Sequence, residues 1–138
     1  KVQADIWSCP SFNELKRDGD EVSRWNLLHP DKKARQCHVT QCLESTEGPV
    51  VAATDYVKLF ADQIRAYVPR SYAVLGTDGF GRSDSREALR KHFEVDRYYI
   101  TIAALNELVG EGGISAKTVK AAIKKYGIDS EKNNPLLS

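Results

Sequence analysis

Apolar side chains follow two different periods along this chain, and together they predict alternating strands and helices. Short apolar runs at Ala4–Cys9, Pro49–Thr54 and Ser71–Leu75 are typical of strands. The run at 49–54 is apolar at consecutive positions, as in a strand that is covered on both faces. We therefore expect an α/β fold with a small, mainly parallel sheet.

Helical spacing of apolar residues and local capping signals predict the remaining elements. Ser11 with Glu14, and Asp84 with Glu87, have the spacing of a capping box. Gly19 is expected to interrupt the first helix. The expected helices, with their caps, are 11–18, 20–28, 37–43, 55–68, 84–92, 96–109 and 115–127. We interpret residues 1–138 as a single domain whose tail, 129–138, is loosely ordered.

Composition narrows the classes of function. With 20 basic and 19 acidic residues the net charge is +1, which gives no electrostatic argument for nucleic acid or an anionic membrane. No apolar run approaches the roughly 20 residues of a membrane helix. Cys9, Cys37 and Cys42 are an odd number and favour a reducing compartment, and with His38 they match no zinc-site spacing. Because the chain has no methionine, we interpret it as a piece of a longer polypeptide.

A glycine-rich corner at Val74–Ser85 is the candidate site. It follows a predicted strand and precedes a predicted helix, which is a common position for binding sites in α/β proteins. Anion binding is one reading, but neither the G-x-G-x-x-G nor the P-loop pattern is present. We favour a contact loop across a domain or dimer boundary, with an aromatic side chain that packs and an arginine that binds a carboxylate. Its candidate residues are Asp78, Phe80, Arg82, Ser83 and Asp84.

Several long motifs resemble one protein family over essentially the whole chain. The resemblance is to the closing domain of the homodimeric bacterial pyruvate dehydrogenase first component, the decarboxylating enzyme of that complex. The matching segments are Val51–Tyr56, Lys58–Ala61, Leu75–Arg86 and His92–Asp96, with Ser11–Leu15, Arg24–Asn26, Leu28–Pro30 and Asn134–Pro135.

The resemblance implies a transketolase-type C-terminal domain: a three-layer α/β/α sandwich, mostly parallel, that here lacks the family's first strand and helix. Dimerisation of the chain, or exposure of the groove left by that strand, is expected. Family members work in the bacterial cytoplasm with thiamine diphosphate and magnesium. They decarboxylate pyruvate and reductively acetylate the lipoyl group of dihydrolipoyl acetyltransferase.

The same resemblance assigns the cofactor to domains outside this chain. The thiamine signature, Gly-Asp-Gly followed by Asn-Asn, is absent, because Arg17–Asp20 has the wrong order and Asn133–Asn134 lies too far away. We therefore expect no cofactor, metal or catalytic residue here, and a role in assembly with the remaining domains and the dimer mate.

Two alternatives of other kinds stay open. The chain could be the equivalent domain of another thiamine-dependent enzyme, or a stand-alone protein-interaction module. A helix-turn-helix reading of 105–128, with serine and lysines on its last helix, is disfavoured by the near-neutral charge of the chain.

Overall fold

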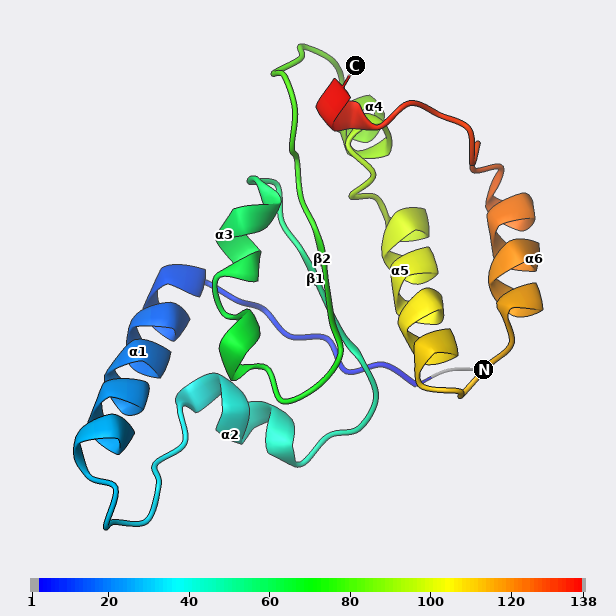
Figure 1. The fold of residues 1–138 in the computed structure, drawn as a ribbon. Helices are drawn as coiled ribbons and strands as arrows, with labels where there is room; N and C mark the ends of the chain where they lie inside the picture. Colours follow the sequence, from blue (N-terminus) through cyan, green and yellow to red (C-terminus); the bar gives the residue numbers. More distant parts are fainter. Residues whose placement is uncertain (1–2, 138) are drawn as a thin grey trace.

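The computed structural model describes residues 3–137, and a pair of parallel strands lies at its centre (Figure 1). Strand β1 (Val50–Ala53) pairs with β2 (Tyr72–Leu75), with Val50 opposite Tyr72 and Ala53 opposite Leu75. Both strands are uniformly apolar, which is typical of strands covered on two faces. The prediction of a small parallel sheet is confirmed.

Helices lie on both sides of this strand pair (Figure 1). Helices α1, α2 and α3 are on one side, and α5 and α6 are on the other, with α4 between the end of β2 and α5. The helices are α1 (Phe12–Leu28), α2 (His38–Glu44), α3 (Lys58–Asp62), α4 (Arg86–His92), α5 (Arg97–Gly110) and α6 (Ala116–Tyr126), with 3-10 turns at Arg65–Tyr67 and Pro135–Leu137. This arrangement confirms the α/β class.

The main core lies on the α1–α3 side of the strands. It is formed by buried residues of α2, the segment after α3 and the start of β2: Cys37, Val39, Leu43, Ile64, Val68 and Tyr72. The Tyr72 hydroxyl donates a hydrogen bond to the Ala61 carbonyl at 2.8 Å, and burial raises the pKa of Tyr72 to about 12. By contrast, α5 has no fully buried residue although it is largely apolar. One side of the sheet is therefore well packed and the other is partly open.

The predicted strand at 4–9 is wrong. Residues 4–9 are extended without a strand partner, and Ile6 is 97% exposed. A strand needs a neighbour for its backbone hydrogen bonds, so an apolar run alone does not form one.

The predicted break at Gly19 is also wrong, since α1 runs without interruption from Phe12 to Leu28. Gly19 is buried, and a Cβ atom there would lie 2.3 Å from the Tyr67 ring. The absence of a side chain at Gly19 therefore allows the Tyr67 ring to lie close to the helix.

Two predicted helix starts are displaced. The helix expected from Asp55 begins at Lys58 and is shortened to α3, followed by the 3-10 turn. The helix expected at Asp84 is capped instead by Ser85, whose hydroxyl accepts from the Ala88 amide at 3.3 Å. Asp96 and Gly127 do act as the predicted cap and stop of α5 and α6, and Gly127 adopts φ 63°.

Candidate contact site at the carboxyl edge of the sheet

The glycine-rich corner lies where both strands end, and it is tied to the loop after β1. The Thr77 amide donates to the Tyr56 carbonyl at 2.8 Å, and the Thr77 hydroxyl donates to the Asp55 carbonyl at 2.9 Å. Gly76 is buried between the two loops, where a Cβ would lie 2.6 Å from the Lys58 nitrogen. Only glycine allows this approach of two backbones.

Asp78, the first candidate residue, has a structural role that the sequence does not reveal. Its carboxylate accepts a hydrogen bond from the Lys58 amide at 2.8 Å. Lys58 is the first residue of α3, so Asp78 satisfies one of the amide groups that a helix start leaves unpaired. The expected cap, Asp55, instead forms an ion pair with Arg90 of α4 at 2.9 Å.

Phe80, Arg82, Ser83 and Asp84 form the exposed tip of the corner. The Phe80 ring is 77% exposed. Arg82 lies beside His92 at the end of α4, with 3.3 Å between Nη1 and Nδ1. The Asp84 carboxylate accepts from the Ser85 amide at 2.7 Å, and Ser83 is exposed. The structure thus brings these residues together at one edge, where the tip faces solvent.

The C-terminal tail packs against this corner. Gly79 has φ 121°, and a Cβ there would lie 2.5 Å from the Pro135 carbonyl oxygen. Lys132 donates to the His92 carbonyl at 2.6 Å and forms an ion pair with Glu94 at 3.2 Å. Pro135 is buried. These contacts join a segment predicted to be loosely ordered to the candidate site.

Exposed apolar side chains gather at the same edge. We call them the edge patch, and they come from the loop after β1, the start of α3, the corner and the tail: Tyr56, Val57, Leu59, Phe80, Leu136 and Leu137. Several large apolar side chains that stay exposed at one edge make this edge a candidate interaction site.

The amide groups at nearby helix starts already have acceptors, which argues against anion binding. Ser85 accepts from α4, Asp78 from α3, and Asp96 accepts from the Tyr98 and Tyr99 amides of α5 at 2.8 and 3.0 Å. An anion would have to displace these side chains. A groove of about 710 Å³ lies beside the end of β1. It is lined by three cations, Arg86, Arg90 and Arg97, and by an equal number of carboxylates, those of Asp55, Glu87 and Asp96.

His92 is held between positive groups, which sets the direction of a pH effect. Partial burial, and then the charges of Arg82 and Lys132, lower the pKa of His92, while Glu94 opposes them. The unfolded chain therefore binds a proton at this position more readily than the folded chain does. Stability contributed by neutral His92 is present above its ordinary pKa and is lost as the pH falls below it.

We expect the free energy of unfolding to fall between about pH 7.5 and about pH 5.5, and to fall less in His92→Asn. Urea denaturation of both proteins at each pH measures the difference. His29 and His38 are common to both and serve as the internal control. An identical pH slope in the variant would contradict this assignment.

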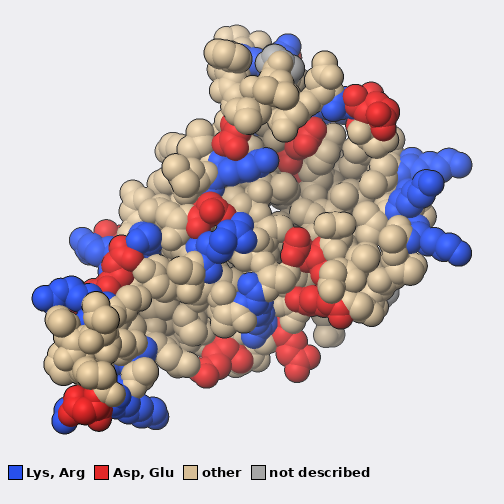
Figure 2. Space-filling model, in the orientation of Figure 1, with Lys and Arg blue, Asp and Glu red and all other residues tan. Residues whose placement is uncertain are grey.

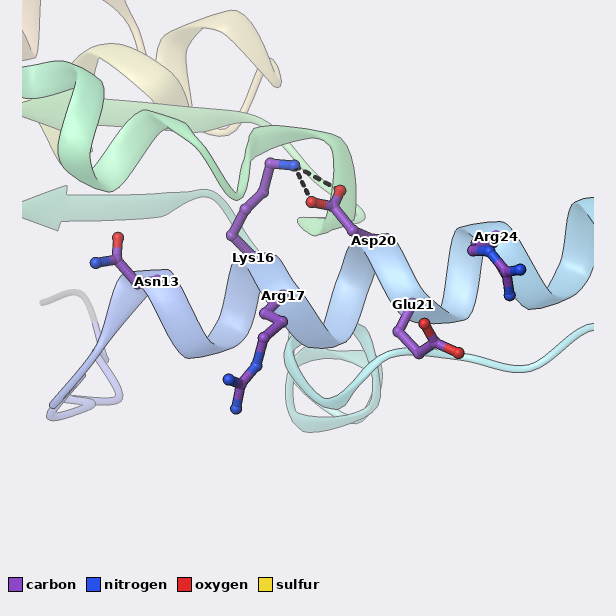
Figure 3. A pocket seen from close by; sticks show the side chains of 6 residues that line it. All are labelled: Asn13, Lys16, Arg17, Asp20, Glu21 and Arg24. Carbon is purple, nitrogen blue, oxygen red and sulfur yellow. Dashed lines mark hydrogen bonds and ion pairs between the residues drawn. The ribbon is translucent and has the colours of Figure 1, made fainter.

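A second pocket lies on the exposed face of α1, and charged side chains that line it form ion pairs (Figure 3). Lys16 contacts both carboxylate oxygens of Asp20 at 2.5 Å, and the Tyr67 hydroxyl donates to the same carboxylate. The hydrogen bond with Asp20 raises the pKa of Lys16. Arg17 bonds to Glu14. The cluster fastens α1 to the 3-10 turn and leaves no free pair of cations.

Residues 3–137 show neither a metal-binding cluster nor a membrane-spanning helix. This part of the chain contains no group of three or more His, Cys, Asp or Glu side chains placed to hold a metal. His38 and Cys42 approach each other, with 3.4 Å between Nε2 and Sγ, and Cys37 is buried beside Thr40. None of the helices in this part combines the length and apolar character that crossing a bilayer requires.

Comparison with known proteins places this architecture in a family. The model of the transketolase-like TK C-terminal domain matches residues 1–96. The chain therefore belongs to the family of transketolase-like C-terminal domains.

The relatives are pyruvate dehydrogenase E1 components. The chain is 60% identical over 136 residues to that of Pseudomonas aeruginosa and 58% identical over 135 residues to that of Cupriavidus necator. It is 54% identical over 138 residues to that of Escherichia coli K12. At least 98% of the chain is covered, but it spans only 15% of the length of these relatives.

Proposed function

We propose that this chain is the C-terminal assembly domain of a pyruvate dehydrogenase E1 component. The observation that carries the proposal is identity of 54–60% to E1 components across nearly the whole chain. The parent enzyme would decarboxylate pyruvate with thiamine diphosphate and magnesium and pass the acetyl group to the lipoyl group of an acyltransferase. The chain lacks the thiamine signature, and we assign it no step of that reaction.

The exposed surface supports a role in assembly. A folded monomer of 15.4 kDa is expected to expose about 7,200 Å², whereas this chain exposes 9,999 Å². The excess of about 2,800 Å² is larger than the roughly 800 Å² that one partner buries in a standard interface. The edge patch supplies apolar side chains for such contacts, and Arg82, two residues after Phe80, supplies a charged side chain in the same corner.

The test uses a full-length chimera, in which this chain replaces the matching segment of the Pseudomonas aeruginosa E1 component. Phe80→Asp in the chimera should raise the dissociation constant of the enzyme's assembly by at least about tenfold, because it places a charge in an apolar contact. Analytical ultracentrifugation measures this constant.

Phe80→Leu is the matched control, since it keeps an apolar side chain at the same exposed position and adds no charge. It should leave the assembly unchanged. Equal constants for both variants and the parent chimera would refute the contact role of the corner.

A further inference from the structure

The end of α1 and the loop that follows carry a charge unlike the rest of the molecule. Residues 22–36 contain four basic side chains and one acidic side chain, a net charge of +3. The whole chain has +1, so the other residues together carry −2. Figure 1 shows this loop as a projection at the lower left, and in Figure 2 two blue groups flank one red group there.

Two leucines lie exposed within this basic region. Leu27 is 78% and Leu28 56% exposed, at the last two positions of α1. Burying exposed leucine side chains favours a contact, because it removes apolar surface from water. We define the α1-end patch as these leucines and the cations of the same segment: Arg24, Leu27, Leu28, Lys32, Lys33 and Arg35. Asp31 of this segment forms an ion pair with Lys32 at 3.2 Å, so the excess positive charge corresponds to the other three cations.

The loop beneath the patch is held in place by specific contacts. The Asn26 side chain accepts from the Arg35 amide at 2.8 Å and donates to the Arg35 carbonyl at 3.0 Å. The Trp25 ring stacks on His29 at 4.3 Å, and the Arg35 guanidinium lies 3.7 Å from the centre of the Trp25 ring. Because the loop is already ordered, a partner would bind without the entropic cost of ordering it.

We propose that the α1-end patch binds an acidic protein segment that presents apolar side chains to Leu27 and Leu28. The cations complement carboxylates, and the leucine pair supplies the apolar contact. Nucleic acid fits less well, because single strands bind through bases stacked on exposed aromatic faces. Here His29 and Arg35 already stack on the Trp25 ring.

The probe is a fluorescent helical peptide with leucines along one face and glutamates at the positions that flank this face. Its anisotropy is measured at low salt with the chain and, in parallel, with the full-length chimera. Saturable binding is expected, and Lys32→Glu/Lys33→Glu should weaken it at least about tenfold through charge repulsion. Leu27→Ser/Leu28→Ser should weaken it too, with circular dichroism confirming the fold of each variant.

Lys117→Glu/Lys120→Glu is the matched control, since it makes the same change of charge on exposed positions of α6. It should change the affinity by less than about twofold. The proposal is overturned if the glutamate peptide does not bind or a lysine peptide with the same leucines binds equally well. Preferential binding of duplex DNA or anionic vesicles would also overturn it. None of these outcomes bears on the proposed function, which concerns the edge patch.

Discussion

Gly76→Ala should destabilise the folded chain by about 3 kcal/mol or more, at the upper end of what overpacking usually costs. A Cβ at this position would lie 2.6, 2.7 and 2.8 Å from the Lys58 nitrogen, the Tyr56 oxygen and the Lys58 Cα. All three are backbone atoms, so no rotamer change relieves the clash. The loops after β1 and β2 would have to separate and lose the hydrogen bond between Thr77 and Tyr56.

Urea denaturation measures this loss, and Gly81→Ala is its control. A Cβ at Gly81 meets no atom within 4 Å, and Gly81 is not among the glycines with positive φ. This variant should stay within about 0.5 kcal/mol of the parent, as surface changes usually do. Equal stability of the two variants would show that the close packing at Gly76 does not hold the corner.

Arg70→Ala should destabilise the chain by about 2–4 kcal/mol, because its charged hydrogen bonds are lost and their acceptors are left without a donor. The guanidinium donates to the Leu43 carbonyl at 2.5 Å, to the Gly48 carbonyl at 3.4 Å, and to the Thr46 carbonyl. It therefore satisfies carbonyl groups at the end of α2 and in the turn before β1.

The comparison with Arg70→Lys separates charge from geometry. Lysine keeps the charge but cannot reproduce the planar fork, so it should recover only part of the lost stability. Urea denaturation of the parent chain, Arg70→Lys and Arg70→Ala gives the order of their free energies of unfolding. Full stability in Arg70→Lys would show that charge alone is sufficient, and full stability in Arg70→Ala would contradict the role assigned to this residue.

Features set by local sequence were predictable. The apolar runs of β1 and β2, the cap at Asp96 and the stop at Gly127 each depend on a few neighbouring residues. The family motifs at 51–56 and 75–86 led to the family that the comparisons show.

Features set by distant contacts were not predictable. Gly19 marks a helix break by local rules, but its packing partner Tyr67 lies in another element. Asp78 caps a helix that begins 20 residues earlier. Arg70, which the sequence does not single out, acts on carbonyl groups at positions 43–48.

Dependence on distant contacts also explains why the strand predicted at 4–9 is absent and why the grouping at the candidate site was not predicted. An apolar run has strand potential, but it forms a strand only beside a partner strand. The grouping of Tyr56, Phe80 and Leu136 at one edge depends on how three loops pack, which no local pattern encodes.

The most direct test of the central claim is the activity and assembly of the unsubstituted chimera. In this protein the chain replaces the matching segment of the Pseudomonas aeruginosa E1 component, to which it is 60% identical. An assembly domain of an E1 component should give a dimer that decarboxylates pyruvate at the rate of the unmodified enzyme. A chimera that is folded by circular dichroism, yet is monomeric or inactive, would contradict the claim.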